Sequence, residues 1–416
     1  MTRAMGNVML LVHRLPYPPN KGDKVRSYHL LKHLAKNHKV FLGTFVDDPA
    51  DEIHLDSVRG MCFEMHAERL SPPIQKIRSL GALLTGQALS LRYYGNAGLQ
   101  SWVRQVMADN PIDSVVVFSS VMGQYINEDS NVNRLIDFVD VDSAKWTQYV
   151  VNHRWPLSWL YRREGKKLLA YERQLALKSE MSFFVTDKEV QLFLQLAPEC
   201  SKYVKTMGNG VDSDYFSVDP ARSNPFPVRV NQETPIYLVF TGAMDYWPNI
   251  DAVTWFVAEV FPALKVRWAA LSFYIVGRSP TAAVLALASH DVVVTGTVAD
   301  VRPYLQHADV VVAPLRLARG IQNKILEAMA MARPVVASQS CVRVTSALPK
   351  TEIAEADTAE DFLREIEALL LFPEQSARMG ASGRQRVVSD YSWSAHLGKI
   401  DNYIHSHQGL QASIEA

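Results

Sequence analysis

The chain has 416 residues, which is too long for one ordinary hydrophobic core, so two domains of similar size are expected. Hydrophobic residues make up 48% and charged residues 21%, a composition typical of globular enzymes that excludes a mostly disordered chain. Lysine plus arginine and aspartate plus glutamate number 43 each, so no overall charge draws the protein to nucleic acid, and any anion site must be local.

The first half of the chain has the pattern of a doubly wound parallel sheet. An apolar strand run at 8–12 leads through a loop rich in proline and glycine into a predicted helix at 23–36, and a second strand follows at 40–45. The N-terminus runs straight into the first strand and lacks the pattern of a signal peptide. Three further short apolar runs predict strands at 114–118, 135–137 and 181–185.

Residues 80–91 have the composition of a helix lying on a membrane surface. They are apolar for several turns, follow Lys76 and Arg78, and are followed by Arg92 and two tyrosines. The same pattern suits a helix buried under a domain cleft, so both interpretations stay open. No stretch reaches the length of about 20 apolar residues that spans a bilayer. Further basic residues indicate either a solvated helix face or contact with anionic headgroups: Arg154, Arg162, Arg163, Lys166, Lys167 and Lys178.

The second half repeats the alternation of strands and helices. A strand followed by a Thr-Gly turn leads into a helix that begins near Asn249. Between the two series, residues 205–219 are rich in glycine, asparagine and aspartate, and we place the hinge there. Two Rossmann-like domains that face each other are therefore expected. The predicted strands of this half lie at 235–240, 272–276, 292–295, 310–313 and 334–337.

The most informative stretch follows the strand at 310–312. A loop there leads into a run with helical spacing from about 323 to 331. Arg316, Arg319 and Lys324 cluster in the loop and the first helical turn, where unpaired backbone N–H groups and the helix dipole attract anions. Three cations in that position predict a binding site for a diphosphate.

Glu327 lies one turn into this helix, on the same side as Asn323 and Lys324. Its carboxylate is suited to accept hydrogen bonds from the two neighbouring hydroxyls of a ribose. An ordinary ion pair with Lys324 or Arg319 on the helix surface also explains the spacing. The residues alone therefore leave both interpretations open.

Motifs in both halves occur in an order that resembles a known family. They are GNGVD at 208–212, FTGAMDYWPN at 240–249, IVGRSP at 275–280, TGTVADVRPYLQHADVVVAPL at 295–315, and the segments APLRLARGIQNK and LEAMAMARPVVAS. Together they resemble the family 4 glycosyltransferases, which are retaining enzymes of the GT-B fold. The segments LPYPPNKGDKVRSYHLLKHL and DFVDVDSAKW resemble, more narrowly, the sugar transferases of exopolysaccharide loci associated with the PEP-CTERM/exosortase system.

The resemblance implies roles for individual residues. Glu327 is expected to bind the nucleotide ribose, and Tyr391-Ser392-Trp393 matches the helix, assigned here to 386–416, that crosses back to the first domain. Transfer with retention of configuration and without a bound metal is implied as well. Within the matched motifs we also assign donor binding to Gly242, Val298 and Asn323.

The chain departs from the family pattern in two places. Many members carry two glutamates eight positions apart. The position eight residues before Glu327 is occupied by Arg319 in this chain. The Arg–Lys pair that often follows the first strand of the second domain is also absent after Gly242. Neutralisation of the leaving diphosphate is therefore expected from Arg316, Arg319 and Lys324, with Arg278 as a further candidate.

The loop of the first domain that contains Lys21 and Gly22 is a candidate site. The resemblance implies that this loop faces the cleft near the donor phosphates, and Gly22 would allow close approach of a ligand. An ordinary strand-to-helix turn with Asp23 as the N-cap explains the same residues.

Asp137, Asp140 and Asp142 form an acidic cluster after a predicted strand. We expect Asp140 or Asp142 to orient the acceptor hydroxyl or the donor sugar, or else to cap the following helix. Asp140-Val141-Asp142 also imitates the metal-binding Asp-x-Asp of another glycosyltransferase fold, but the two-domain layout and the cationic donor site disagree with that interpretation.

We therefore predict an α/β glycosyltransferase of the GT-B fold, with the acceptor held by residues 1–205 and a UDP- or GDP-linked sugar held by 206–385. Arg319, Lys324 and Asp140 are the catalytic candidates, and preorganised cations would stabilise the leaving diphosphate. We expect no cofactor, no metal and no nucleic acid partner, a glycan or lipid-linked acceptor, a role in exopolysaccharide synthesis, and a location in the cytoplasm or at the inner face of the plasma membrane. A nucleotide-sugar epimerase on the same fold and a non-catalytic nucleotide-sugar-binding subunit are the alternatives.

Overall fold

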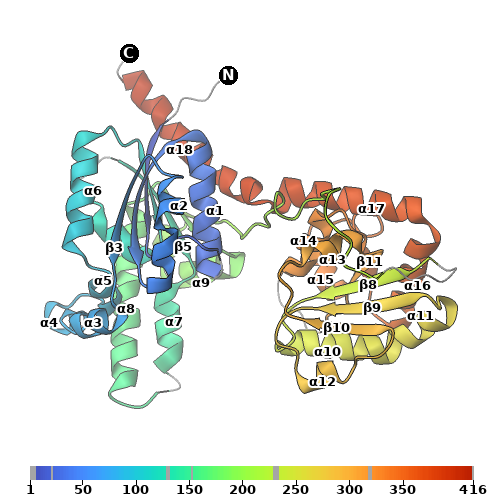
Figure 1. The fold of residues 1–416 in the computed structure, drawn as a ribbon. Coiled ribbons are helices and arrows are strands. Elements are labelled where there is room, and N and C mark those ends of the chain that lie inside the picture. Colours follow the sequence, from blue (N-terminus) through green and yellow to red (C-terminus); the bar gives the residue numbers. More distant parts are fainter. Residues whose placement is uncertain are drawn as a thin grey trace. The chain divides into compact units, whose positions relative to one another are not determined.

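The structure is a computed structural model that describes residues 6–19, 22–127, 132–150, 153–227, 234–316 and 321–414. It divides into two compact units, which Figure 1 shows as ribbons. Unit 1 contains the chain up to Asn209 and again from His396, and unit 2 contains Gly210–Ala395.

Unit 1 is built on a seven-stranded sheet with the order β3-β2-β1-β4-β5-β6-β7. Every neighbouring pair is parallel, and the order is that of a doubly wound fold. The central strands are buried along their length because helices cover a parallel sheet on both faces, which explains their apolar sequences. The strands are β1 Asn7–Val12, β2 Lys39–Val46, β3 Glu64–Arg69, β4 Ser114–Phe118, β5 Asn133–Val139, β6 Met181–Phe184 and β7 Val204–Thr206.

The helices of unit 1 differ widely in length. The long ones connect the strands, whereas three short ones follow β3 in succession. The helices are α1 Gly22–Asn37, α2 Leu55–Arg59, α3 Pro72–Ser79, α4 Ala82–Thr85, α5 Leu89–Tyr93, α6 Ala97–Asp109, α7 Asp142–Tyr149, α8 Leu157–Leu177, α9 Asp187–Leu196 and, in its larger part, α18 Trp393–Ile414.

Unit 2 repeats this architecture with a six-stranded parallel sheet in the order β10-β9-β8-β11-β12-β13. Its strands are β8 Ile236–Thr241, β9 Leu271–Val276, β10 Val292–Gly296, β11 Val310–Ala313, β12 Val335–Ser338 and β13 Ala354–Ala356. Its helices are α10 Trp247–Trp255, α11 Phe261–Arg267, α12 Ala282–Leu285, α13 Arg302–His307, α14 Asn323–Ala330, α15 Gln339–Val342, α16 Ala359–Leu371 and α17 Pro373–Arg386.

The two-sheet prediction is confirmed, and each predicted strand lies within a residue or two of an observed one. The prediction of one helix over residues 80–91 is wrong. The chain there forms α4 and α5 with a break at Gly86, whose φ of 73° is left-handed and ends the first of them. None of the described helices is long and apolar enough to cross a membrane.

A buried ion pair in unit 1 holds the chain where it leaves this unit. Arg26 of α1 binds Asp137 of β5 through Nε at 2.7 Å and through a second nitrogen at 3.0 Å, and both side chains are almost inaccessible. The same guanidinium donates to the carbonyl oxygens of Met207 and Gly208 and to the side chain of Asn209. A single arginine therefore connects the core of the sheet to the exit segment.

Candidate functional site

A cavity of about 620 Å³ lies in unit 2 at the carboxyl ends of β8 and β9. Its wall comprises the turns that follow these strands, the segment after β10 and the beginning of α14. Ligands bind at this edge in open parallel sheets, and the volume is in the range of small-molecule sites.

Two glycines bring the backbone segments of the cavity together. The Gly242 N–H donates to the carbonyl of Val276 at 3.0 Å. A Cβ atom on Gly277 would lie 1.6 Å from the carbonyl oxygen of Gly242, and one on Gly242 would lie 2.9 Å from Lys324 Nζ. The turn after β9 therefore needs glycine at position 277, whereas a side chain on Gly242, in the turn after β8, would displace the end of the Lys324 side chain.

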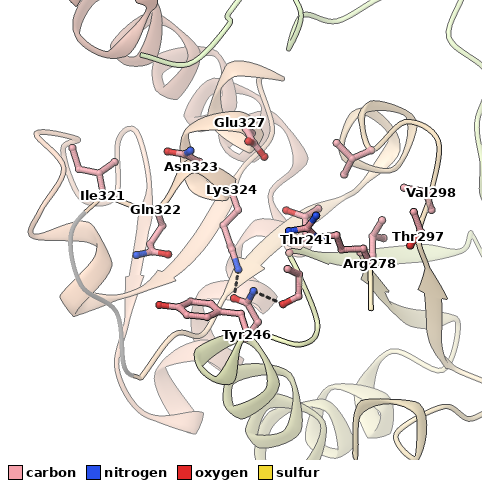
Figure 2. Close-up of a pocket in the computed structure, with 16 residues that line it drawn as sticks. Thr241, Tyr246, Arg278, Thr297, Val298, Ile321, Gln322, Asn323, Lys324 and Glu327 are labelled. Carbon is pink, nitrogen blue, oxygen red and sulfur yellow. Dashed lines mark hydrogen bonds between the residues drawn. The ribbon is translucent and has the colours of Figure 1, made fainter. Parts of the chain in front are cut away.

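Lys324 comes from the first turn of α14 and lines the cavity, as Figure 2 shows. Nζ donates to Asn249 Oδ1 at 2.5 Å and lies 4.1 Å from the centre of the Phe240 ring. Asn249 Nδ2 donates in turn to the carbonyl of Ala243 at 2.8 Å, which fixes the amide. Among the described residues no carboxylate lies within ion-pair distance of Lys324, so its charge is available to a bound anion.

Burial shifts the protonation of both ionisable side chains that α14 contributes to the cavity. It lowers the pKa of Lys324 to about 7, although the neighbouring Glu327 carboxylate favours the charged ammonium. It raises the pKa of Glu327 to about 7, although Lys324 favours the charged carboxylate. Both groups therefore titrate near neutral pH, where small changes in the cavity alter their charge.

The side of the cavity away from α14 carries Arg278, Thr297 and Val298, which Figure 2 shows across from Lys324. The structure thus brings six of the predicted site residues to one cavity: Gly242, Arg278, Val298, Asn323, Lys324 and Glu327. It also adds Tyr246 from the turn after β8 and Asn249 from the first turn of α10, which sequence reasoning missed as site residues. Asn249 is buried two residues into α10, and this burial is visible only in the structure.

Arg316 does not lie where the prediction requires. Its guanidinium pairs with Asp251 of α10, with Nε 3.0 Å from a carboxylate oxygen, and it lies 5.8 Å from the ring of Trp255. It is half exposed and is not among the residues that line the cavity. The paired carboxylate neutralises it, so it contributes little to an anion in the cavity.

Arg319 and Lys21 lie outside the described residues. Gly22 is the first residue of α1 and has open space where a Cβ atom would be. Asp140, in unit 1, pairs with Lys145 at 2.8 Å, and Lys145 also contacts Asp142 at 3.0 Å. Neither aspartate caps α7, whose N-cap residue Val141 offers no side-chain hydrogen bond.

A polar cluster that sequence reasoning missed lies at the carboxyl end of β1 in unit 1. Arg14 donates to Asp47 at 2.8 Å and to Asp23 at 2.7 Å. The neighbouring His13 stacks on Phe118, and its hydrogen bond to Asp23, together with Arg14, holds the pKa of that carboxyl well below its usual range. This edge of the sheet is where a doubly wound domain binds ligands. Among the described residues, no three His, Cys, Asp or Glu side chains form a group that could hold a metal ion.

Comparison with known proteins places the cavity in a known domain. Residues 235–371, which contain every residue that lines the cavity, match the family model described as "Glycosyl transferases group 1". The whole chain resembles solved structures of low sequence identity. These findings support a glycosyltransferase of the GT-B fold.

Three solved structures illustrate this similarity. A glycosyltransferase from Rickettsia africae has 14% identity and a TM-score of 0.60 over 97% of this chain and 99% of its own. HepE from Anabaena, crystallised with UDP, has 13% identity and a TM-score of 0.58 over 97% and 100%. Sucrose-phosphate synthase from Thermosynechococcus elongatus has 16% identity and a TM-score of 0.57 over 98% and 100%. No curated protein matches this sequence.

Proposed function

We propose that this glycosyltransferase moves a sugar from a nucleotide sugar, bound in the cavity of unit 2, to a glycan or lipid-linked acceptor. The observation that carries the proposal is the placement of Lys324, Asn323 and Glu327 on the first turns of one helix, inside a cavity of a group 1 domain. HepE, a structural neighbour, has been crystallised with UDP and with UDP-glucose, which makes a uridine nucleotide the first donor to test.

Lys324 would stabilise the diphosphate that leaves. Its ammonium is held by Asn249 and the Phe240 ring rather than by a carboxylate, so it needs little reorganisation to meet an anion. A bound diphosphate favours the charged form and raises the lowered pKa of the ammonium again. The positive end of the α14 dipole lies at the same place.

Glu327 would hold the ribose, and Arg278 would add a second cation at the exposed rim of the cavity. A carboxylate can accept hydrogen bonds from two neighbouring hydroxyls, and this charge-assisted pair is stronger than neutral hydrogen bonds. Retention of configuration, catalysis without a metal and a role in exopolysaccharide synthesis complete the proposal, and they follow from the family resemblance. The acceptor would bind to unit 1, for which the cluster of His13, Arg14 and Asp23 is the candidate.

Thermal-shift measurements with UDP, GDP, ADP and their sugars test the donor. A ligand present at about 100 times its dissociation constant adds about 2.7 kcal/mol to the free energy of unfolding. We expect one nucleotide class to raise the melting temperature of the wild type clearly more than that of Glu327→Gln, while the exposed control Glu360→Gln responds like the wild type. If no nucleotide shifts the wild type, the donor proposal is wrong.

Transfer itself is tested with the radiolabelled donor that binds and with a membrane extract as acceptor. We expect label to enter an extractable product only when both are present. Conversion of the donor sugar without any acceptor would instead identify an epimerase. Tight binding with no transfer would identify a binding subunit.

A further inference from the structure

Helix α3 of unit 1 buries polar side chains and exposes apolar ones. Its buried residues are the polar Gln75 and Ser79, whereas Ile74 and Ile77 are 57% and 72% exposed. A surface helix normally turns its apolar side chains to the core. Within the part of the chain that the structure describes, the outward apolar face of α3 is left exposed and is open to a binding partner.

The apolar surface continues past the end of α3. Leu80 and Leu83 are exposed, and Leu84 of α4 is 93% exposed. The backbone beneath is held firmly, because Arg163 of α8 donates to the carbonyls of Ala82 and Gln87 at 2.8 and 3.0 Å. The leucines therefore point outward from a fixed segment.

The buried carboxylate of Glu164 completes this attachment. It accepts hydrogen bonds from the backbone N–H groups of Leu89 and Ser90, the latter at 2.8 Å. Figure 1 shows α3, α4 and α5 gathered beside α8.

The beginning of α8 adds aromatic side chains to the same side. Trp159 lies four residues before Arg163, and Lys167 lies four residues after it, so the three share one face of the helix. Trp159 is half exposed and Trp155, just before the helix, is 81% exposed. We call the following exposed residues the α3–α8 surface: Ile74, Ile77, Leu80, Leu83, Leu84, Trp155, Leu157 and Trp159.

The charges around the α3–α8 surface have one sign. The sequence contains no aspartate or glutamate at 70–108 and none at 143–163, and Glu164 is buried. Six exposed cations in or beside these segments form no ion pair with a described residue: Lys76, Arg78, Arg154, Arg162, Lys166 and Lys167.

We propose that the α3–α8 surface docks on the anionic face of a lipid bilayer, with the isoleucines, leucines and tryptophans in the headgroup region and the cations on acidic headgroups. Exposed apolar and tryptophan side chains with lysine and arginine around them are what an interfacial element requires. A second copy of the chain fits less well, because a two-fold contact would place the same cations against one another. This inference goes beyond the proposed transfer reaction, since it does not depend on the donor.

Flotation of the full-length protein with vesicles tests the proposal, without any nucleotide present. Vesicles of phosphatidylcholine alone are compared with vesicles that also contain phosphatidylglycerol. We expect binding only to the anionic vesicles, with a loss of binding at high salt. Arg162→Gln and Lys166→Gln are each expected to weaken partitioning about fivefold.

The apolar contribution is tested with Ile77→Glu/Leu84→Glu, which should weaken partitioning about tenfold or more. The matched control is Val266→Glu, which alters an 86% exposed residue of α11 in unit 2 and should leave partitioning unchanged. Because all the substituted side chains are exposed, we expect every variant to melt at the temperature of the wild type. Equal melting temperatures will then show that every variant is folded. The proposal is overturned if the wild type binds neither vesicle, if the double variant binds like the wild type, or if the wild type is a dimer that the double variant dissociates.

Discussion

Replacing Lys324 by methionine is expected to stabilise the protein while it lowers turnover. In our proposal the Lys324 ammonium binds the donor diphosphate. Without a ligand, burial of the ammonium lowers the pKa of Lys324 from 10.5 to about 7. Methionine keeps the length and most of the apolar contact of the side chain but carries no charge. The substitution therefore separates the stability of unit 2 from the electrostatics of the site.

The magnitude follows from the protonation equilibria. At pH 7 the lowered pKa of Lys324 corresponds to about 4 kcal/mol of lost stability, because the unfolded chain holds the proton much more tightly. The variant loses the hydrogen bond to Asn249 and the contact with the Phe240 ring, each of which contributes about 1 kcal/mol. The net gain is then about 2 kcal/mol, or about 4–8 °C in melting temperature for a domain of this size.

The sign of the pH dependence is fixed by the direction of the shift. Between pH 7 and 10.5 the unfolded chain binds a proton at Lys324 that the folded chain does not, so the stability of the wild type rises with pH in this window. The advantage of Lys324→Met is therefore greatest at pH 7 and below, falls to zero at about pH 9, where it equals the loss of the two contacts, and reverses at higher pH.

Differential scanning calorimetry from pH 6 to about 10 measures this advantage, and kcat with the donor that binds measures the cost. We expect kcat to fall by about 10²–10³, the usual effect of removing one preorganised donor, with a smaller change in donor affinity. Arg343→Met, on an exposed side chain outside the cavity, is the control for both measurements. A variant that melts below the wild type at pH 7, or that keeps its kcat, would refute the reasoning.

Three further substitutions test other parts of the structure. Glu327→Gln should weaken donor binding about 10–100-fold with little change in kcat, which titration calorimetry and kinetics measure. The raised pKa of Glu327 makes the wild type less stable as the pH rises from 4.5 to about 7, and melting curves should show that the variant lacks this fall in stability. Gly242→Ala places a Cβ atom 2.7 Å from Asn249 Nδ2, so the ends of the Asn249 and Lys324 side chains should shift. Activity should then be lost while the fold survives, as kinetics and circular dichroism will show. Asp137→Asn leaves the charge of Arg26 buried without its partner and should cost about 3–5 kcal/mol by denaturant titration.

The substitution of Asp137 has a matched comparison. Asp140→Asn breaks an ion pair with Lys145 that is about one-third to one-half exposed, and it should cost at most about 1 kcal/mol. An equal cost for Asp137→Asn and Asp140→Asn would show that burial does not set the strength of the Arg26 pair. Unchanged kinetics in Gly242→Ala, or unchanged donor affinity in Glu327→Gln, would contradict the geometry of the cavity.

Much of the fold could be predicted from the sequence because a parallel strand that is covered on both faces is an unbroken apolar run, as in β4. Strand β3 escaped prediction because it is an edge strand whose sequence, Glu64–Arg69, alternates charged with other residues. The predicted helix at 80–91 failed because apolar composition does not reveal a left-handed glycine, here Gly86.

The candidate site divides in the same way. Asn323, Lys324 and Glu327 could be predicted together because they lie on one helix, whose periodicity is visible in the sequence. The partner of Arg316 could not, since Asp251 belongs to another helix and only the packing of unit 2 brings the two together. Asn249 was missed for the same reason: its contact with Lys324 joins residues 75 positions apart.

The hydrogen bonds that Arg26 donates to residues 207–209 restrict the backbone of this stretch. Since Arg26 holds the chain as far as Asn209, that stretch moves with α1 and β5 as one body. Gly210, the next residue, is packed so tightly against Trp393 that a Cβ atom would lie 2.5 Å from the nitrogen of that residue. Removal of the Arg26 guanidinium would therefore release residues 207–209 from the core of unit 1 and leave the packing of Gly210 against Trp393 within unit 2 untouched.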